Sequence, residues 1–194
     1  PSFSFFFFLD INKDIKGTLK YSLKGLSQKK NTNVTFIYLL NYLEYSSNLN
    51  ILKNGITNNF YFLYKNASKK GENSSNYSND FESDNFISTI FTSSLPMKKN
   101  YKKFQSNLTP KASLRLSPFD SENISDLDRQ LNMTNLFSNN RLGLSDSLEG
   151  GQSITLGLDY DISDRQDNTF FSTSLGQIFR DVDDGKLPLS STMN

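Results

Sequence analysis

The sequence offers carboxylates, lysines, arginines and hydroxyls for chemistry, but it contains no His and no Cys. Imidazole general bases, thiolate nucleophiles and the usual ligands of structural zinc are therefore missing from this stretch. The tetrapeptide Ser27–Lys30 matches the S-x-x-K pattern of serine acyl-transfer enzymes, but the companion motifs of those enzymes are absent. We predict that the protein is not an enzyme and uses no metal and no cofactor.

Arg141, Asp146 and Glu149 form the one charged constellation that we keep as a candidate site. They fall in a long polar segment just before a strand-like run. Two interpretations stay open: a charge network that folds this long loop over the ends of the strands, or ordinary surface charge at the start of a strand. In solvent such a network would contribute little, about 0–1 kcal/mol per ion pair.

Two further charge clusters are predicted to be solvated loops. The acidic cluster could hold a divalent cation but lacks the spacing of an EF-hand; it consists of Asp181, Asp183 and Asp184. The basic cluster could attract phosphate groups; it consists of Lys98, Lys99, Lys102 and Lys103. Over the whole chain 21 Lys and Arg residues balance 20 Asp and Glu residues, which leaves a net charge of +1. That balance gives no support to a nucleic-acid partner.

Alternation of apolar and polar residues with period two is the main structural signal. It is clearest at 151–162 and 107–116, where the apolar residues fall on one face of an extended strand. We predict about eight strands, at 2–10, 17–25, 33–53, 56–66, 86–96, 104–117, 151–162 and 168–180. The predicted fold class is all-β, an antiparallel up-and-down meander in which 104–117 pairs with 151–162 across the long connection 118–150.

Asn54-Gly55 lies between two strand-like runs and is the strongest local signal for a hairpin. A two-residue turn at this position places Glu44 opposite Lys65 on the polar face of the ribbon. The connection 163–167 is predicted to close the hairpin between the last two strands.

The connections mostly alternate between short and long, as in outer-membrane barrels with short periplasmic turns and long external loops. No apolar run approaches the roughly 20 residues of a spanning helix. A soluble β-sandwich or a secreted β-solenoid would show the same period-two pattern with its apolar face inward. The discriminating observation is whether Ile154 and Leu156 pack against a second sheet or stay exposed for contact with lipid.

The segment 135–160 reads NLFSNNRLGLSDSLEGGQSITLGLDY. It resembles the barrel domain of the LptD family, the lipopolysaccharide-assembly proteins of Gram-negative outer membranes. The family pattern is approximately N-L-[FY]-S-x-N-R, then a Gly, an Asp and E-x-G before an alternating strand that contains a Gly. The matching residues are Asn135, Leu136, Phe137, Ser138, Asn140, Arg141, Gly143, Asp146, Glu149, Gly151, Gly157 and Tyr160. The stretches 108–111 and 175–180 resemble neighbouring strands of the family.

The resemblance implies a function in lipopolysaccharide transport and assembly, as part of the barrel that inserts lipopolysaccharide into the outer leaflet. It implies localisation in the cell outer membrane, with lipopolysaccharide, outer-membrane lipid and an LptE-like plug lipoprotein as partners. We therefore expect residues 1–194 to be a partial transmembrane β-barrel domain, an open segment of a large outer-membrane β-barrel. The family's jelly-roll domain and the seam of its barrel are expected to lie outside this stretch.

Polar residues that alternate with apolar ones are expected to face the lumen of such a barrel. The predicted lumen-facing residues are Ser153, Thr155, Asp159, Lys111 and Arg115. Other functions stay open at this point: a soluble or secreted β-sandwich or adhesin-like structural module, and another outer-membrane barrel of porin type. An outer-membrane enzyme is disfavoured, because the enzymes of this kind that we considered rely on His.

Overall fold

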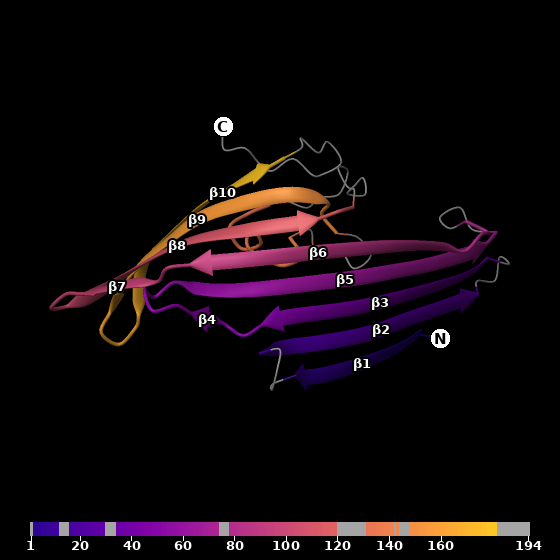
Figure 1. Cartoon of the computed structure of the whole chain (residues 1–194), viewed down its shortest axis with the longest axis horizontal. Helices are drawn as coiled ribbons and strands as arrows, with labels where there is room; N and C mark the ends of the chain where they lie inside the picture. Colours follow the sequence, from indigo (N-terminus) through magenta and orange to yellow (C-terminus); the bar gives the residue numbers. More distant parts are fainter. Residues whose placement is uncertain are drawn as a thin grey trace.

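The computed structural model describes residues 2–11, 16–29, 34–73, 78–119, 131–141, 143 and 148–181, and only the backbone of 2–11. These residues form one 10-stranded antiparallel sheet (Figure 1). Its strands are β1 (Ser2–Ile11), β2 (Gly17–Lys29), β3 (Thr35–Ser47), β4 (Asn50–Ile51), β5 (Thr57–Glu72), β6 (Glu82–Ser94), β7 (Met97–Asn100), β8 (Phe104–Ser117), β9 (Gly151–Asp164) and β10 (Thr169–Arg180). The part of the chain that the structure describes has no helix capable of crossing a membrane.

The sheet is a meander, which confirms the predicted fold class. The strand order is β1-β2-β3-β5-β6-β8-β9-β10, with the short strands β4 and β7 paired to β5 and β8. The predicted pairing of β8 with β9 is confirmed, and it runs from Phe104 opposite Asp164 to Ser117 opposite Gly151. The last two strands form the predicted hairpin, although its connection is 165–168 and not 163–167. The strand path ends at β1 and β10, so the sheet is open.

In β8 and β9 the two faces of the sheet have opposite chemistry, whereas the inner face of β5 and β6 buries an apolar cluster, which consists of Tyr61, Leu63, Phe86 and Ile90 with Leu148. In β9, Ser153 and Thr155 are only 4% and 2% exposed, whereas Ile154 and Leu156 are 48% and 47% exposed. A soluble sheet would bury the apolar face instead. Among the described residues no second sheet covers Ile154 and Leu156, so the β-sandwich interpretation is wrong. We call the face of Ser153 the inner face and the face of Ile154 the outer face.

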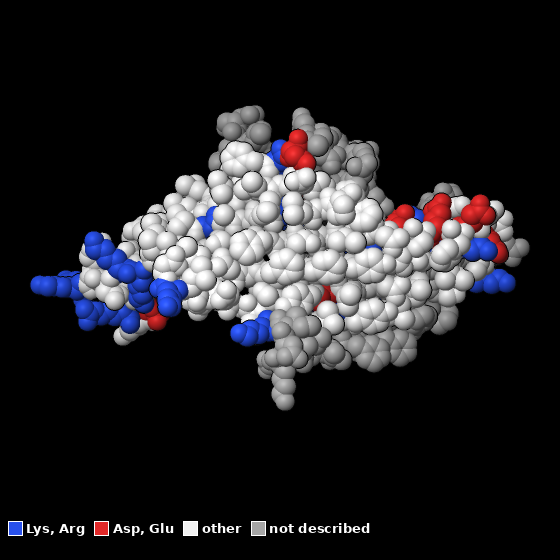
Figure 2. Space-filling model, in the orientation of Figure 1, with Lys and Arg blue, Asp and Glu red and all other residues white. Residues whose placement is uncertain are grey.

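A row of apolar side chains crosses the outer face from β5 to β10. Each member lies directly opposite the next in the register of the sheet, and each is at least 38% exposed. This apolar row consists of Phe60, Phe91, Leu114, Ile154 and Phe179. Figure 2 shows that charged side chains gather at the two ends of the sheet and leave the band between them almost free of charge. The outer face therefore carries a continuous apolar belt.

The hairpin at Asn54-Gly55 forms, but its turn is longer than predicted. The N–H of Gly55 donates to the carbonyl of Leu52 at 2.9 Å, and the N–H of Leu52 donates to the carbonyl of Ile56 at 2.8 Å. The loop thus holds three residues, with Gly55 at a φ of 84°. A turn followed by a left-handed Gly is the usual three-residue alternative to the two-residue turn that Asn-Gly also favours.

An irregularity near Ser47 adds a second change of register. Its Oγ accepts a hydrogen bond of 2.8 Å from the N–H of Phe60. The two changes together put Glu44 opposite Leu63, so the predicted pair of Glu44 with Lys65 is wrong. Because the total shift is two residues, Glu44 and Lys65 still share one face, as predicted.

Two predicted connections contain strand. The predicted short connection 97–103 includes β7, and most of the predicted loop 67–85 belongs to β5 and β6. Side-chain hydrogen bonds join these polar strands; one example is the bond from Asn66 Nδ2 to Asn85 Oδ1, at 3.0 Å. Their Ser-rich and Asn-rich composition resembles a loop, but the paired backbone and these side-chain bonds keep them extended.

Candidate functional site

The described part of the connection between β8 and β9 packs on the inner face, behind these strands in the view of Figure 1. We call residues 131–141, 143 and 148–150 the inner loop. Its first turn is built by Asn132, whose carbonyl accepts the N–H of Leu136 at 2.9 Å and whose Oδ1 accepts the N–H of Thr134 at 2.9 Å. Asn140 Oδ1 accepts the N–H of Gly143 at 3.1 Å. Such Asn-centred turns fold a short segment locally.

Two glycines form a seat for the inner loop. Gly157 of β9 lies directly opposite Gly176 of β10. A Cβ atom on Gly157 would stand 2.6 Å from the Phe137 ring, and one on Gly176 would collide with Leu136. Leu136 is buried, and the ammonium of Lys111 lies 4.3 Å from the centroid of the Phe137 ring. Any larger residue at either glycine would therefore push the loop off the strands.

Arg115 reaches from β8 to the backbone of the inner loop. Its guanidinium donates to the carbonyl of Ser138 at 2.8 Å and to the carbonyl of Asn139 at 3.0 Å. It also donates to Ser88 Oγ at 3.3 Å. Arg115 is only 4% exposed, and hydrogen bonds from a charged donor contribute more than neutral ones, about 1.5–3 kcal/mol each.

Arg141 makes the reciprocal connection, from the inner loop to the sheet. Its Nε and Nη2 hold the two carboxylate oxygens of Glu149 at 2.8 and 2.7 Å. The same guanidinium donates to Ser153 Oγ at 2.8 Å and to Thr155 Oγ1 at 3.1 Å. Arg180 of β10 adds a second cation 3.2 Å from Glu149 Oε1. The loop is thus tied to β9 and β10 by one carboxylate shared between two arginines.

This ion pair is shielded from water. The side chains of Arg141 and Glu149 are 1% and 3% exposed. Burial lowers the pKa of Arg141, while the neighbouring Glu149 carboxylate acts in the opposite direction. A guanidinium nevertheless keeps its charge in proteins. The interpretation of these two residues as ordinary surface charge is therefore wrong.

Most predicted site residues lie in or beneath the inner loop. These are Asn135, Phe137, Asn140, Arg141, Gly143, Glu149, Gly157, Ser153, Thr155, Asp159, Lys111 and Arg115. Gly151 starts β9 with a φ of 74°. Asp146 lies outside the described residues, so its part in the charge network stays a prediction.

Two contributors to the site escaped the sequence analysis, although both lie in the stretch 175–180 that resembles the family. Gly176 forms half of the glycine seat, and Arg180 is the second cation beside Glu149. The signal that would have found them is the register between β9 and β10, which sets Gly176 against Gly157 and Arg180 against Ser153. An irregularity near Thr169 hides that register from a simple count across the turn.

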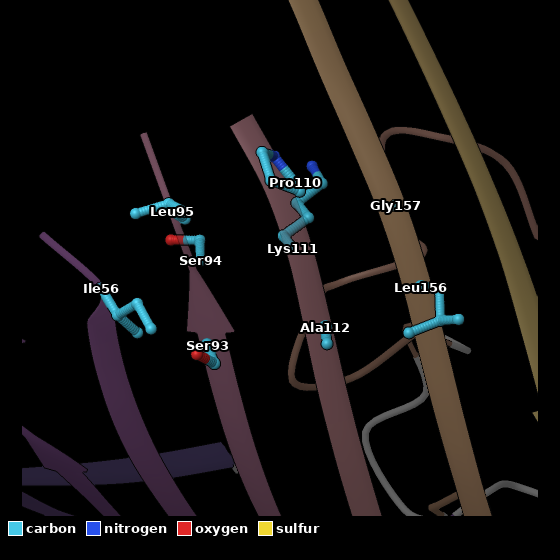
Figure 3. Close-up of a pocket in the computed structure, with 9 residues that line it drawn as sticks. All are labelled: Ile56, Ser93, Ser94, Leu95, Pro110, Lys111, Ala112, Leu156 and Gly157. Atoms are coloured by element: carbon cyan, nitrogen blue, oxygen red, sulfur yellow. The ribbon is translucent and has the colours of Figure 1, made fainter. Parts of the chain in front are cut away.

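A shallow pocket of about 380 Å³ opens between β5, β6, β8 and β9 (Figure 3). Small side chains such as Ser93 and Ala112 hollow it, and Leu156 and Pro110 border it. Its lining is mainly apolar, with Ser and Lys as the polar residue types. The pocket is thus a dent in the apolar belt and brings no convergent set of polar groups together.

An open antiparallel meander that exposes apolar side chains on its outer face and packs a loop on its inner face has the architecture of a β-barrel segment. The comparison with protein families identifies which kind: the model of LptD, LPS transport system D, matches residues 43–193. The chain belongs to this family, and its function is lipopolysaccharide transport and assembly at the outer membrane. The family is one of transport and assembly proteins, not enzymes. No curated protein matches the chain.

The glycine seat predicts the effect of a larger residue at position 157. Gly157→Val should displace Phe137 and release the inner loop, because overpacking a filled site costs about 1–3 kcal/mol. Limited proteolysis of the chain in detergent micelles should then cut within 131–141 roughly tenfold faster or more. The control Leu158→Val changes a side chain on the other face of the same strand. Restored protection in the double variant Gly157→Val, Phe137→Ala would support the seat, whereas an unchanged cleavage rate in Gly157→Val would contradict it.

The buried ion pair predicts a large and coupled loss of stability. Arg141→Gln should lower the free energy of unfolding by about 3–5 kcal/mol, because it leaves a buried carboxylate without its main partner. Denaturant titration in micelles measures this loss. The partly exposed pair of Lys69 with Asp84 is the control, and Lys69→Gln should cost at most about 1 kcal/mol. A double variant of Arg141 and Glu149 whose cost equals the sum of the single costs would contradict the pairing.

Proposed function

We propose that residues 1–194 form part of a transmembrane β-barrel domain in the cell outer membrane, with the outer face in lipid and the inner face lining the lumen. The observation that carries this proposal is the exposed apolar row, which backs directly onto buried polar groups such as Arg115 and Ser153. Apolar surface in water costs about 25 cal/mol per Å², and a continuous exposed belt of this kind marks contact with a membrane or a partner.

The free edges of β1 and β10 support the partial-barrel proposal. In hydrocarbon each unpaired backbone group costs several kcal/mol, so spanning sheets close on themselves. In this proposal further strands close the barrel, and the jelly-roll domain and the barrel seam of the family lie outside these strands.

A polar ladder supports a membrane boundary on the outer face; it crosses the middle of β3 and lies nearest to a longer connection in β6. Tyr21 Oη donates to Asn41 Oδ1 at 2.9 Å, and Asn41 Nδ2 donates to Asn66 Oδ1 at 3.1 Å. Tyr64 Oη and Asn66 Nδ2 both donate to Asn85 Oδ1, at 2.8 and 3.0 Å. Tyrosines beside a polar row are typical of the aromatic girdles of outer-membrane barrels. In this proposal the ladder lies at the headgroups.

The inner face outside the inner loop is the proposed contact surface for partners. Lys20 and Lys24 of β2 share the face of Glu44 and Leu40 and are exposed. Lysine ammonium groups bind phosphate as point charges. We assign this surface to the sugar and phosphate groups of passing lipopolysaccharide and to an LptE-like plug lipoprotein, with the inner loop narrowing the lumen beside them.

A charge in the apolar belt tests the membrane placement. Ile154→Arg should reduce insertion of the chain into phosphatidylcholine vesicles, because Arg near the bilayer midplane of a barrel costs about 2–4 kcal/mol. Protease protection after dilution from urea measures the inserted fraction. The control Gln166→Arg adds the same charge in an exposed turn and should insert like the parent chain. Equal insertion of both variants would argue against the outer face as the lipid surface.

A further inference from the structure

The end of the sheet with the short turns carries a dense basic cluster, visible at the left of Figure 2. We call it the basic tip. Its members lie in the turns around β4, β7 and the β9–β10 hairpin, and all are exposed: Lys53, Lys98, Lys99, Lys102, Lys103 and Arg165. Four of these lysines, at 98, 99, 102 and 103, were predicted to form a solvated loop.

Contacts between neighbouring turns bring these residues together. In the register of the sheet, Phe104 at the start of β8 lies opposite Asp164, the residue before Arg165. The turn of Lys53 lies beside the root of β7, since a Cβ on Gly55 would stand 3.7 Å from the side chain of Leu95. The three turns therefore present one positive surface.

An aromatic pair adjoins the ammonium groups. Tyr101 and Phe104 stack with ring centroids 4.4 Å apart, and both remain more than one third exposed. Lys99 Nζ lies 5.2 Å from the centroid of the Tyr101 ring. Phe104 is on the outer face, because the next residue, Gln105, is buried on the inner face. Aromatic rings at the edge of an apolar belt with lysines beyond them are typical of a membrane–water interface.

The acidic residues of the tip do not cancel its charge. Asp164 accepts hydrogen bonds from the N–H groups of Gln166 and Asn168 at 2.7 and 2.9 Å, within its own turn. Asp167 accepts a hydrogen bond from the Gln105 side chain. The tip holds six basic side chains and these two carboxylates, so its net charge is positive.

We propose that the basic tip docks on the headgroups of anionic phospholipids and thereby sets the depth of the sheet in the bilayer. The proposal rests on the membrane placement argued above. Short turns of outer-membrane barrels face the periplasm, so the tip meets the leaflet opposite the one into which the family inserts lipopolysaccharide. Basic residues beside an anionic leaflet each add to membrane attraction, and the effect fades within a Debye length.

Vesicle co-flotation of the full chain tests the proposal. The tip variant carries Lys98→Gln, Lys99→Gln, Lys102→Gln and Lys103→Gln. The control variant carries Lys29→Gln, Lys30→Gln, Lys69→Gln and Lys70→Gln, which removes the same charge away from the tip and from the surface of Lys20 and Lys24. Vesicles contain phosphatidylcholine alone, phosphatidylcholine with phosphatidylglycerol, or phosphatidylcholine with lipopolysaccharide at equal surface charge.

We expect the parent chain and the control variant to prefer phosphatidylglycerol vesicles, and the tip variant to lose roughly tenfold or more of that preference. The preference of the parent chain should vanish at about 1 M salt, where the Debye length is about 3 Å. Equal binding of the tip variant and the parent chain to phosphatidylglycerol vesicles would overturn the proposal. A stronger preference of the parent chain for lipopolysaccharide than for phosphatidylglycerol would also overturn it. In either case, insertion into neutral vesicles would leave the membrane placement intact. With residues 1–194 carried in the closed barrel, so that no strand edge is left unpaired in lipid, failure of every variant to insert into any vesicle would overturn both.

Discussion

Backbone hydrogen bonding in a medium without water is the constraint on which the rest of this structure depends. Hydrocarbon offers no partner for a free N–H or carbonyl, and an antiparallel meander satisfies each strand with its sequence neighbours on both sides. Once the strands are paired, alternate side chains must face opposite ways. In the proposed membrane placement, lipid selects Ile154 and Phe91 for one face, while Ser153 and Arg115 remain for the other. The same constraint requires further strands to pair with the open edges of β1 and β10.

The inner face also has to be filled, and the inner loop shows how the chain does so. Glycines at 157 and 176 remove two side chains so that Leu136 and Phe137 can approach the strands. Arg115 points from the sheet to the loop and Arg141 from the loop to the sheet, so charged hydrogen bonds close the contact from both sides. A loop fixed in this way has a defined shape, which suits a passage that must admit one kind of cargo.

Strands such as β8 were predictable because the two faces of the sheet meet different surroundings, which imposes alternation along the strand. The bounds of β8 were predicted as the structure has them. The strand register that pairs Glu44 with Leu63 was not predictable. Asn54-Gly55 suits more than one turn length, and the Ser47 hydroxyl accepts the N–H of Phe60 in place of a backbone carbonyl. The strands on either side of Asn66 and Asn85 were hidden by a composition typical of loops. Arg141 and Glu149 were found through their motif, whereas Gly176 and Arg180 depend on a register that only the folded sheet displays.

The most direct test of the membrane placement uses the absence of Cys from the chain. A single spin-labelled cysteine is introduced at each position from Ser153 to Leu158 except Gly157, which has no room for a side chain, in the protein inserted into vesicles. Collision rates with oxygen, which concentrates in lipid, and with a water-soluble nickel complex are then measured by electron paramagnetic resonance. The structure predicts a period of two, with high oxygen access at Ile154, Leu156 and Leu158 and low access to both reagents at Ser153 and Thr155. Oxygen access without this alternation, or with the opposite phase, would contradict the account.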